Sequence, residues 1–285
     1  MSATIAAILR TATEQLLTVS PSARLDSELL LAHVLGTNRV GLILKANSSV
    51  SEDQLARFEQ LVARRANFEP VAYLTGHREF FGLDFEVSPE VLIPRPETEL
   101  LVELAVKFAA TLNPPISILD LGTGSGCIAI SIADQLRDRK QITIQAVDRS
   151  AQALAIAKRN SERLGTEITF LESDWFSAFS GLDQRFDLIV SNPPYIAVGA
   201  TDTSPELKHE PQGALYSSGE QGVDAVLKLC SELPRYLRKE GVFFCEIGAA
   251  QASLISERLA GAGFEIKFHP DLAGIKRVLQ CALTY

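Results

Sequence analysis

Apolar residues in the first 70 positions recur every three to four residues, the interval that places them on one face of an α-helix. The pattern runs through residues 5–17 and again through residues 25–35, with few β-branched runs. Ser51, followed by two acidic residues, predicts the N-terminal cap of a further helix that ends near Asn67. The pattern therefore predicts a small helical module at the start of the chain.

A different pattern follows this module. Two short runs rich in aromatic and β-branched residues flank Gly82, and three prolines follow within residues 89–96. This arrangement is typical of a β-hairpin that leads into a linker. We expect the boundary between domains to lie between residues 70 and 90, with a helical domain at 1–75, a hairpin and linker at 76–96, and a larger domain at 97–285.

From Glu97 onward, short apolar runs alternate with longer amphipathic ones. The short runs have the length of β-strands: 116–120, 142–147, 167–171, 187–191, 242–247, 264–269 and 276–283. The longer runs have helical periodicity: 97–111, 126–138, 151–164, 222–238 and 249–262. Such alternation predicts an α/β fold in which helices cover both faces of a mostly parallel sheet and ligands bind outside the carboxyl ends of the strands.

Composition narrows the functional classes. With 285 residues, of which 46% are hydrophobic, the chain can build more than one core. No apolar stretch reaches the roughly 18 residues that a membrane-spanning helix needs. The first 17 residues fit an amphipathic helix better than a signal peptide. We therefore expect a cytoplasmic protein without membrane association.

Charge and cysteine content disfavour further functional classes. Asp and Glu total 35 against 27 Lys and Arg, a formal net charge of −8, which disfavours sequence-independent contact with nucleic-acid phosphates. Arg57, Arg64 and Arg65 are interleaved with acidic residues, so we expect them on a solvated helix face in preference to a phosphate-binding track. The four cysteines are far apart and have aliphatic neighbours, which predicts buried thiols rather than disulfides or a zinc site.

A glycine-rich loop follows the first predicted strand of the larger domain. Gly122, Gly124 and Gly126 alternate with Thr123 and Ser125 and lead straight into a predicted helix. Glycines can adopt positive φ and bring main-chain N–H groups to a ligand at a helix N-terminus. The loop also fits the dinucleotide pattern GxGxxG/A, so by itself it does not separate a nicotinamide cofactor from S-adenosylmethionine.

Side chains at the next two strand ends support a ligand of the adenosine type. Asp148 ends the second predicted strand, where its carboxylate could accept hydrogen bonds from a ribose diol; a helix N-cap is the alternative role. Asp174 and Trp175 follow the third strand. The indole could stack on an adenine beside the carboxylate, although a core tryptophan is the alternative.

The most specific motif is Asn192-Pro193-Pro194-Tyr195, which follows the fourth predicted strand. Because proline lacks an N–H donor, the loop is rich in acceptors beside the Asn192 amide oxygen. Such acceptors suit a planar NH₂ group: Asn192 Oδ1 and the Pro193 carbonyl can each hold one hydrogen while Tyr195 covers the π face. We therefore expect these residues to catalyse a reaction at a planar nitrogen.

At this point the sequence resembles the peptide chain release factor N5-glutamine methyltransferase family. This family belongs to the class I S-adenosylmethionine-dependent methyltransferases that carry Asn-Pro-Pro-Tyr. The resemblance rests on VLIPRPETELLVE, LDLGTGSGCIAI, FDLIVSNPPYI and HEPQGALYSSGEQGVDAV, and it spans nearly the whole chain. It implies a Rossmann-like, seven-stranded methyltransferase sheet with a small helical N-terminal domain for substrate recognition. It also implies methyl transfer from S-adenosylmethionine to the glutamine of the Gly-Gly-Gln motif in class 1 release factors, without a direct nucleic-acid substrate.

The resemblance also implies a role for each motif. The loop Gly122–Gly126, including Thr123, Gly124 and Ser125, would contact the methionine part of the cofactor. Asp148 would bind the ribose and Trp175 the adenine region, while Asn192–Tyr195 would hold the substrate glutamine and Asn192 would also touch the cofactor. The segment with Arg95, Glu97 and Thr98 would close over the site, unless it is only a linker, and Glu210 and Pro211 would lie at its rim.

Two other functions fit parts of the pattern. An adenine-N6 methyltransferase acting on DNA or RNA would present the same planar NH₂ group, although the acidic net charge and the lack of a basic recognition module disfavour it. A binding protein that has lost its chemistry would not need the glycine loop, Asp148 and Asn192 together. No covalent intermediate is expected, because His77 and His209 are isolated and no Gly-x-Ser-x-Gly motif occurs.

Overall fold

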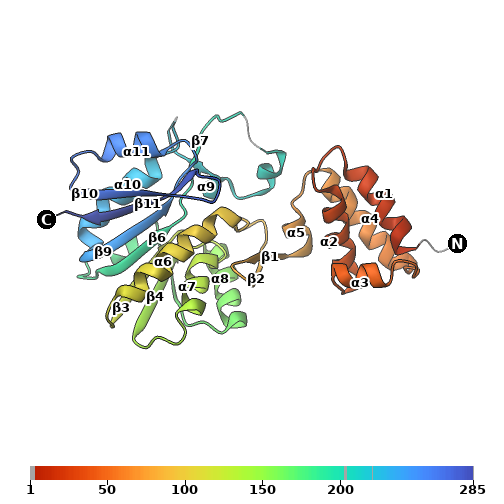
Figure 1. Ribbon diagram of the computed structural model, residues 1–285, viewed down its shortest axis with the longest axis horizontal. Coiled ribbons are helices and arrows are strands. Elements are labelled where there is room, and N and C mark those ends of the chain that lie inside the picture. The colour runs from red at the N-terminus through yellow and green to blue at the C-terminus, as the bar shows by residue number, and fades with distance from the viewer. Residues whose placement is uncertain (1–3, 202–203, 220, 285) are drawn as a thin grey trace. The chain divides into compact units, whose positions relative to one another are not determined.

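The computed structural model describes residues 4–201, 204–219 and 221–284 (Figure 1). The chain forms two compact units. One consists of Met1–His77 together with Ser204–His209, and the other of Arg78–Thr203 and Glu210–Tyr285. In the described part of the chain, no helix is both long enough and apolar enough to cross a membrane.

The first unit is helical, as the apolar spacing predicts. Its helices are α1 (Ile5–Leu16), α2 (Ala23–Leu35), α3 (Arg39–Leu44), α4 (Glu52–Ala66) and α5 (Val71–Thr75), followed late in the chain by the 3₁₀ turn η3 (Pro205–His209). Ser51 caps α4: its hydroxyl accepts the Gln54 N–H and the Gln54 side chain returns to the Ser51 N–H, a capping box. The helix ends with Asn67 as its C-cap, so both predicted ends are confirmed.

One prediction for this unit is wrong. Arg65 does not lie on a solvated face: it is buried, and its guanidinium pairs with Asp26 at 2.7 Å and with Glu206 at 2.6 Å. A buried cation needs such partners, and these two lie far from it in the sequence, where spacing along one helix gives no sign of them. Arg64 does remain exposed and pairs with Glu69. The Arg65–Glu206 pair holds the segment Ser204–His209 in the helical unit.

The second unit is built on a seven-stranded sheet, which confirms the predicted fold class. Its strands are β3 (Ile116–Leu121), β4 (Ile142–Asp148), β5 (Thr169–Glu172), β6 (Phe186–Ser191), β9 (Leu237–Glu246), β10 (Phe264–Pro270) and β11 (Lys276–Leu283). They lie in the order β10-β11-β9-β6-β3-β4-β5. The pairs β5-β4, β4-β3, β3-β6 and β6-β9 are parallel, and β11 is antiparallel to both of its neighbours.

Helices cover both faces of this sheet (Figure 1). One face packs against α6 (Glu99–Thr111) and α7 (Cys127–Gln135), and α8 (Ala151–Leu164) contacts α7 and the neighbouring strands. The other face packs against α10 (Asp224–Tyr236) and α11 (Ala252–Leu259). The central strands are covered on both sides, which is why they carry nearly continuous apolar runs. All four cysteines are buried and free, as predicted.

Short elements complete the unit around the strand ends. The hairpin expected around Gly82 is β1 (His77–Phe80) and β2 (Leu83–Glu86), and the 3₁₀ turn η1 (Pro96–Thr98) leads into α6. The others are η2 (Ser177–Phe179), α9 (Gln212–Leu215) and the pair of two-residue strands β7 (Ile196–Ala197) and β8 (Tyr216–Ser217).

One strand begins earlier than the sequence predicts. β9 starts at Leu237 instead of at residue 242. Phe186 pairs with Leu237 and Leu188 already pairs with Val242, so the polar residues between them form an irregularity in the ladder. Arg238, Lys239 and Glu240 are exposed there, and a run of three charged residues gives no strand signal in the sequence.

Candidate active site

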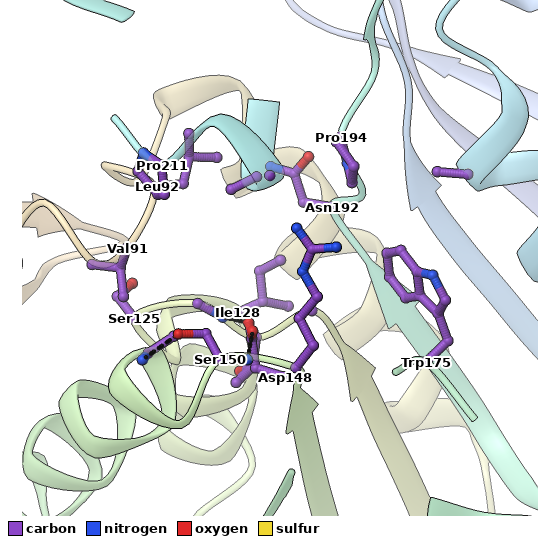
Figure 2. A pocket seen from close by; sticks show the side chains of 18 of the residues that line it. Val91, Leu92, Ser125, Ile128, Asp148, Ser150, Trp175, Asn192, Pro194 and Pro211 are labelled. Carbon is purple, nitrogen blue, oxygen red and sulfur yellow. Dashed lines mark hydrogen bonds between the residues drawn. The ribbon is translucent and has the colours of Figure 1, made fainter. Parts of the chain in front are cut away.

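A cavity of about 570 Å³ lies at the carboxyl ends of the parallel strands in the second unit. Its lining includes residues from the segments 90–98, 122–128, 148–153, 173–175, 192–194 and 211–228. Figure 2 shows Asn192 and Pro194 on one side of this cavity, Asp148 and Ser150 on the opposite side, and Trp175 at a third side. The strand ends therefore meet at one place, as expected for a parallel sheet.

Most of the residues singled out in the sequence line this cavity. They are Arg95, Thr98, Gly122, Thr123, Gly124, Ser125, Asp148, Asp174, Trp175, Asn192, Pro194 and Pro211. The described lining does not include Glu97, Gly126, Pro193, Tyr195 or Glu210. The two isolated histidines, His77 and His209, are not part of it either. Both belong to the helical unit, within which the His209 ring contacts the Asn67 carbonyl.

Main-chain hydrogen bonds tie the glycine loop to the end of β4. The N–H groups of Gly122 and Thr123 both donate to the Val147 carbonyl at 2.9 Å. Gly126 has φ +82°, and a Cβ there would lie 2.8 Å from the Ile130 side chain. Only glycine fits such a position without strain, so the loop can turn tightly from β3 into α7.

Asp148 is fixed by two main-chain donors. Its Oδ2 accepts the Gly124 N–H at 2.9 Å and its Oδ1 accepts the Ser150 N–H at 2.9 Å. Ser150, not Asp148, caps α8, because the Ser150 hydroxyl accepts the Ala153 N–H. A carboxylate oxygen can accept more than one hydrogen bond, so Asp148 keeps acceptor capacity toward the cavity.

Trp175 both lines the cavity and touches the core of the sheet. Its ring lies over Gly122, where a Cβ would be only 3.4 Å from the indole. The Trp175 backbone has φ +53°, a left-handed conformation that costs a residue with a Cβ about 1–2 kcal/mol. Strained backbone of this kind is concentrated at functional sites, and here it occurs at a residue that lines the cavity.

Asp120, at the base of the glycine loop, is completely buried. Its Oδ2 accepts the Thr123 hydroxyl hydrogen bond at 2.6 Å, while Oδ1 has no partner among the described residues. Burial raises the pKa of this carboxyl to about 7, partly opposed by the Thr123 hydrogen bond. The sequence shows only that Asp120 lies at the end of a predicted strand, so its burial and its raised pKa could not be predicted.

Asn192 presents an unpaired acceptor. Its Nδ2 donates to the Thr98 hydroxyl at 3.2 Å. Its Oδ1 is buried and, within the described chain, has no hydrogen-bond partner. Buried polar atoms are nearly always paired in folded proteins, so an orphaned amide oxygen beside a cavity is an acceptor available to a ligand.

The Tyr195 hydroxyl is engaged by a buried carboxylate. The phenol donates to the carboxylate of Glu246, and burial raises the Tyr195 pKa well above its usual value. The main-chain carbonyl of Tyr195 accepts the Gln251 Nε2 hydrogen bond at 2.9 Å. The Tyr195 side chain is thus tied to the end of β9. The expected stacking of its ring on a substrate stays a prediction.

Glu246, the last residue of β9, is a buried carboxylate next to Asn192's partner. It accepts hydrogen bonds from the hydroxyls of Thr98 and Tyr195, while its Oε2 has no partner in the described structure. Burial raises the pKa of Glu246 to about 7 against these two hydrogen bonds. The signal available in the sequence is an acidic residue that directly follows the apolar run VFFC.

The proline-rich segment before α6 forms part of the cavity wall rather than only a linker. Val91, Leu92 and Pro94 line the cavity. Behind them, the buried carboxylate of Glu210 accepts the Ile93 N–H at 3.1 Å and pairs with Arg95 at 2.5 Å. Glu210 therefore lies behind the wall and holds it in place.

The cavity offers positioning groups rather than an activated nucleophile. Cys127 lies in the lining, but burial raises its thiol pKa to about 12. A thiol with such a pKa is protonated at neutral pH and is a poor nucleophile. In the described residues, no cluster of His, Cys, Asp and Glu could hold a metal ion. The arrangement is therefore suited to binding and orienting two reactants.

Solved structures share this fold. A methyltransferase from Pyrococcus furiosus aligns with a TM-score of 0.52 at 19% identity, over 82% of this chain and 100% of that one. The T. thermophilus 16S rRNA N2 G1207 methyltransferase, solved in complex with AdoMet and guanosine, aligns with a TM-score of 0.51 at 21% identity, over 73% and 50% of the two chains. At these identities the likeness concerns the fold alone.

Sequence comparison identifies the family. A PrmC N-terminal domain model matches residues 7–76, and a methyltransferase small domain model matches residues 98–240. The release factor glutamine methyltransferase of Burkholderia pseudomallei is 44% identical over 92% of this chain and 93% of its own length. That of Geobacter sulfurreducens is 41% identical over 90% and 89%. The chain is therefore a methyltransferase that belongs to the release factor glutamine methyltransferase family.

Proposed function

We propose that this enzyme transfers a methyl group from S-adenosylmethionine to the side-chain amide nitrogen (N5) of the glutamine in the Gly-Gly-Gln motif of class 1 release factors. The observation that carries the proposal is the unpaired Oδ1 of Asn192 at the cavity. A glutamine side chain ends in a planar NH₂ group that needs acceptors when it leaves water. Its family relatives are named for this class of substrate.

The cavity fits the proposed cofactor in size and in chemistry. Its volume of about 570 Å³ falls within the range typical of cofactor sites. The loop Gly122–Ser125 would hold the methionine part, and the fixed carboxylate of Asp148 would accept hydrogen bonds from the ribose hydroxyls. The face of Trp175 would contact the adenine, with Asp174 near its exocyclic amine.

The chain's own residues would contribute mainly by positioning. When bound, the cofactor supplies an electrophilic methyl group. An amide nitrogen is a weak nucleophile, so it must be held in line with that methyl group, and orientation alone can supply a large part of the rate. Asn192 Oδ1 would accept one N–H of the glutamine and the Pro193 carbonyl the other, which favours the positive charge that develops on nitrogen.

The partner and its cellular setting belong to the same proposal. Class 1 release factors are protein substrates, so no direct contact with nucleic acid is required for the reaction. The formal net charge of −8 agrees with a protein rather than a polyphosphate as partner. We place the reaction in the cytoplasm, where translation terminates.

Labelled S-adenosylmethionine tests the proposal. The enzyme is incubated with a class 1 release factor, with the same factor carrying Ala in place of the Gly-Gly-Gln glutamine, and with DNA and RNA. Label in the first sample alone is the expected result. Label in nucleic acid but not in the release factor would overturn the proposal in favour of adenine methylation.

Two variants of the enzyme locate the chemistry. Asn192→Ala should lower turnover at least about a hundredfold, the usual cost of a lost directional contact in a transition state, while the affinity for S-adenosylmethionine changes little. Asn113→Ala, at an exposed position outside the cavity, is the matched control. Full activity of Asn192→Ala would refute the proposed acceptor role of this residue.

A further inference from the structure

A connected set of polar side chains lies behind the acceptor Asn192. Thr98, just before α6, accepts the Asn192 Nδ2 hydrogen bond at 3.2 Å and donates its hydroxyl proton to Glu246. Tyr195 donates its phenol proton to the same carboxylate. Thr98 and Glu246 are each 2% exposed. The first and last residues of Asn-Pro-Pro-Tyr are thus connected to one buried group.

The direction of these hydrogen bonds follows from the single proton of Thr98. A hydroxyl can donate one hydrogen bond and accept two, so by itself it would tolerate either end of an asparagine amide. An ionised carboxylate only accepts. With Glu246 taking the Thr98 proton, the oxygen of Thr98 offers only lone pairs to Asn192, and only the NH₂ end of the amide can bind there.

This direction decides what Asn192 presents to the cavity. With Nδ2 on Thr98, the Oδ1 atom is the end left without a partner. The reversed amide would place two acceptors, Oδ1 and the Thr98 oxygen, against each other. It would also turn an N–H donor toward the proposed NH₂ substrate, so that donor would meet donor. Either mismatch leaves a buried polar group unpaired, which is costly.

Other charged groups act on Glu246 from neighbouring elements. Glu97 on η1 raises the pKa of Glu246 and Arg277 on β11 lowers it, while burial is the largest influence. Tyr195 donates to the carboxylate, and the negative charge of Glu246 helps to raise the pKa of the buried thiols Cys127 and Cys245. When Glu246 is protonated it can itself donate, and the direction of the Thr98 hydroxyl is no longer fixed.

We propose that Glu246, acting through Thr98, is a positioning residue that fixes the amide of Asn192 with its oxygen toward the substrate. The proposal rests on the proposed glutamine methylation. Glu246 does not line the cavity, so its effect on the reaction passes through Thr98 and Asn192. The bond to Tyr195 holds the other end of the same motif.

Threonine variants test the relay. Thr98→Val keeps the shape of the side chain but removes both hydrogen bonds, whereas Thr98→Ser restores the hydroxyl. We expect Thr98→Val to lower kcat by about tenfold or more, as for other lost positioning contacts, with KM for the release factor and affinity for S-adenosylmethionine changing less. Thr98→Ser should recover most of the loss. Thr111→Val, which removes an exposed hydroxyl at the C-terminal end of α6, is the matched control.

A double-mutant cycle separates the relay from a general structural role. If Thr98 acts through Asn192, Thr98→Val should cost nothing further in an Asn192→Ala background, measured as single-turnover label transfer. Full additivity of the two losses would overturn the relay. So would an unchanged kcat in Thr98→Val. Absence of label transfer by the wild-type enzyme would instead refute the proposed function itself.

The pH profile gives an independent reading of Glu246. In the wild type, kcat should fall as pH decreases through about 7, the region where the Glu246 carboxyl gains its proton. Glu246→Gln removes the titrating group, so its kcat should be lower at pH 8 and should lack that acidic limb. An identical acidic limb in Glu246→Gln would show that another group titrates, and would contradict the role of Glu246.

Discussion

Asp148 offers the sharpest test of the cofactor site, because its two carboxylate oxygens are both engaged by main-chain donors. Oδ2 accepts the Gly124 N–H and Oδ1 the Ser150 N–H, each at 2.9 Å. Asp148→Asn keeps the size of the side chain but replaces one oxygen with NH₂. Whichever way the new amide turns, it places a donor against one of these two N–H groups.

The magnitude follows from what the carboxylate would give to a ribose. A hydrogen bond to a charged group contributes about 1.5–3 kcal/mol, so losing the charged acceptor should weaken binding by about tenfold to a hundredfold. The mismatched main-chain N–H should lower the free energy of unfolding by about 1 kcal/mol, at the lower end of the cost of an unsatisfied donor because the site is partly exposed. Binding should therefore change more than stability.

Isothermal titration calorimetry with S-adenosylmethionine measures the first quantity and urea unfolding the second. Asp183→Asn, which changes an exposed carboxylate outside the cavity, controls for the change in net charge. An Asp148→Asn enzyme that binds the cofactor as tightly as the wild type would refute the assignment of Asp148 to the ribose. Equal weakening in Asp183→Asn would show that only net charge matters.

Three further predictions concern stability and the cavity wall. At Gly126, φ is +82° and an added Cβ would lie 2.8 Å from Ile130, so Gly126→Ala should lower the free energy of unfolding by about 2–4 kcal/mol. Gly165→Ala, at φ +67° with open space around it, should lower the free energy of unfolding by only about 1 kcal/mol. Urea unfolding measures both losses, and equal losses would contradict the packing argument. The pKa of Glu246 is raised from 4.5 to about 7 in the folded state, so the unfolded state releases this proton at a lower pH than the folded state does. The free energy of unfolding of the wild type, relative to that of Glu246→Gln, should therefore fall by about 3 kcal/mol as pH rises from 4.5 to 7 and then level off. An increase over that interval would refute the predicted direction. Glu210→Gln weakens the contact that holds residues 93–95, so hydrogen exchange of the Ile93 amide should accelerate by about tenfold; unchanged exchange would show that this contact does not hold the wall.

The sheet could be predicted closely because periodicity is a local property. Strands 142–147 and 276–283 of the sequence prediction correspond to β4 and β11 almost residue for residue. The same reasoning missed the start of β9, where an irregular ladder with Phe186 brings charged residues into the strand. That irregularity depends on the neighbouring strand, so no pattern within 237–241 reveals it.

Some side chains of the candidate site could be predicted from the sequence and others could not, for the same reason. Asp148 and Asn192 could be singled out because each directly follows a strand and has a chemistry that suits a ligand. Thr98 and Glu246 could not be assigned their contacts, since one precedes the sheet and the other follows an apolar run much later in the chain. Their roles depend on burial and on hydrogen-bond partners that only folding brings together.

The placement of the negative charge at Glu246 has a physical reason. An aspartate in place of Asn192 would accept hydrogen bonds whichever way it turned, but it would place a full charge against the reacting groups and next to Thr98. A neutral asparagine avoids that charge, yet it has a donor end that must be kept away from the substrate. Glu246 lies outside the cavity lining, behind the Thr98 hydroxyl, where its charge can orient the amide without meeting the substrate. Burial in this place raises the pKa of Glu246. Protonation of Glu246 should therefore change both the orientation of the Asn192 amide and the free energy of unfolding of the enzyme.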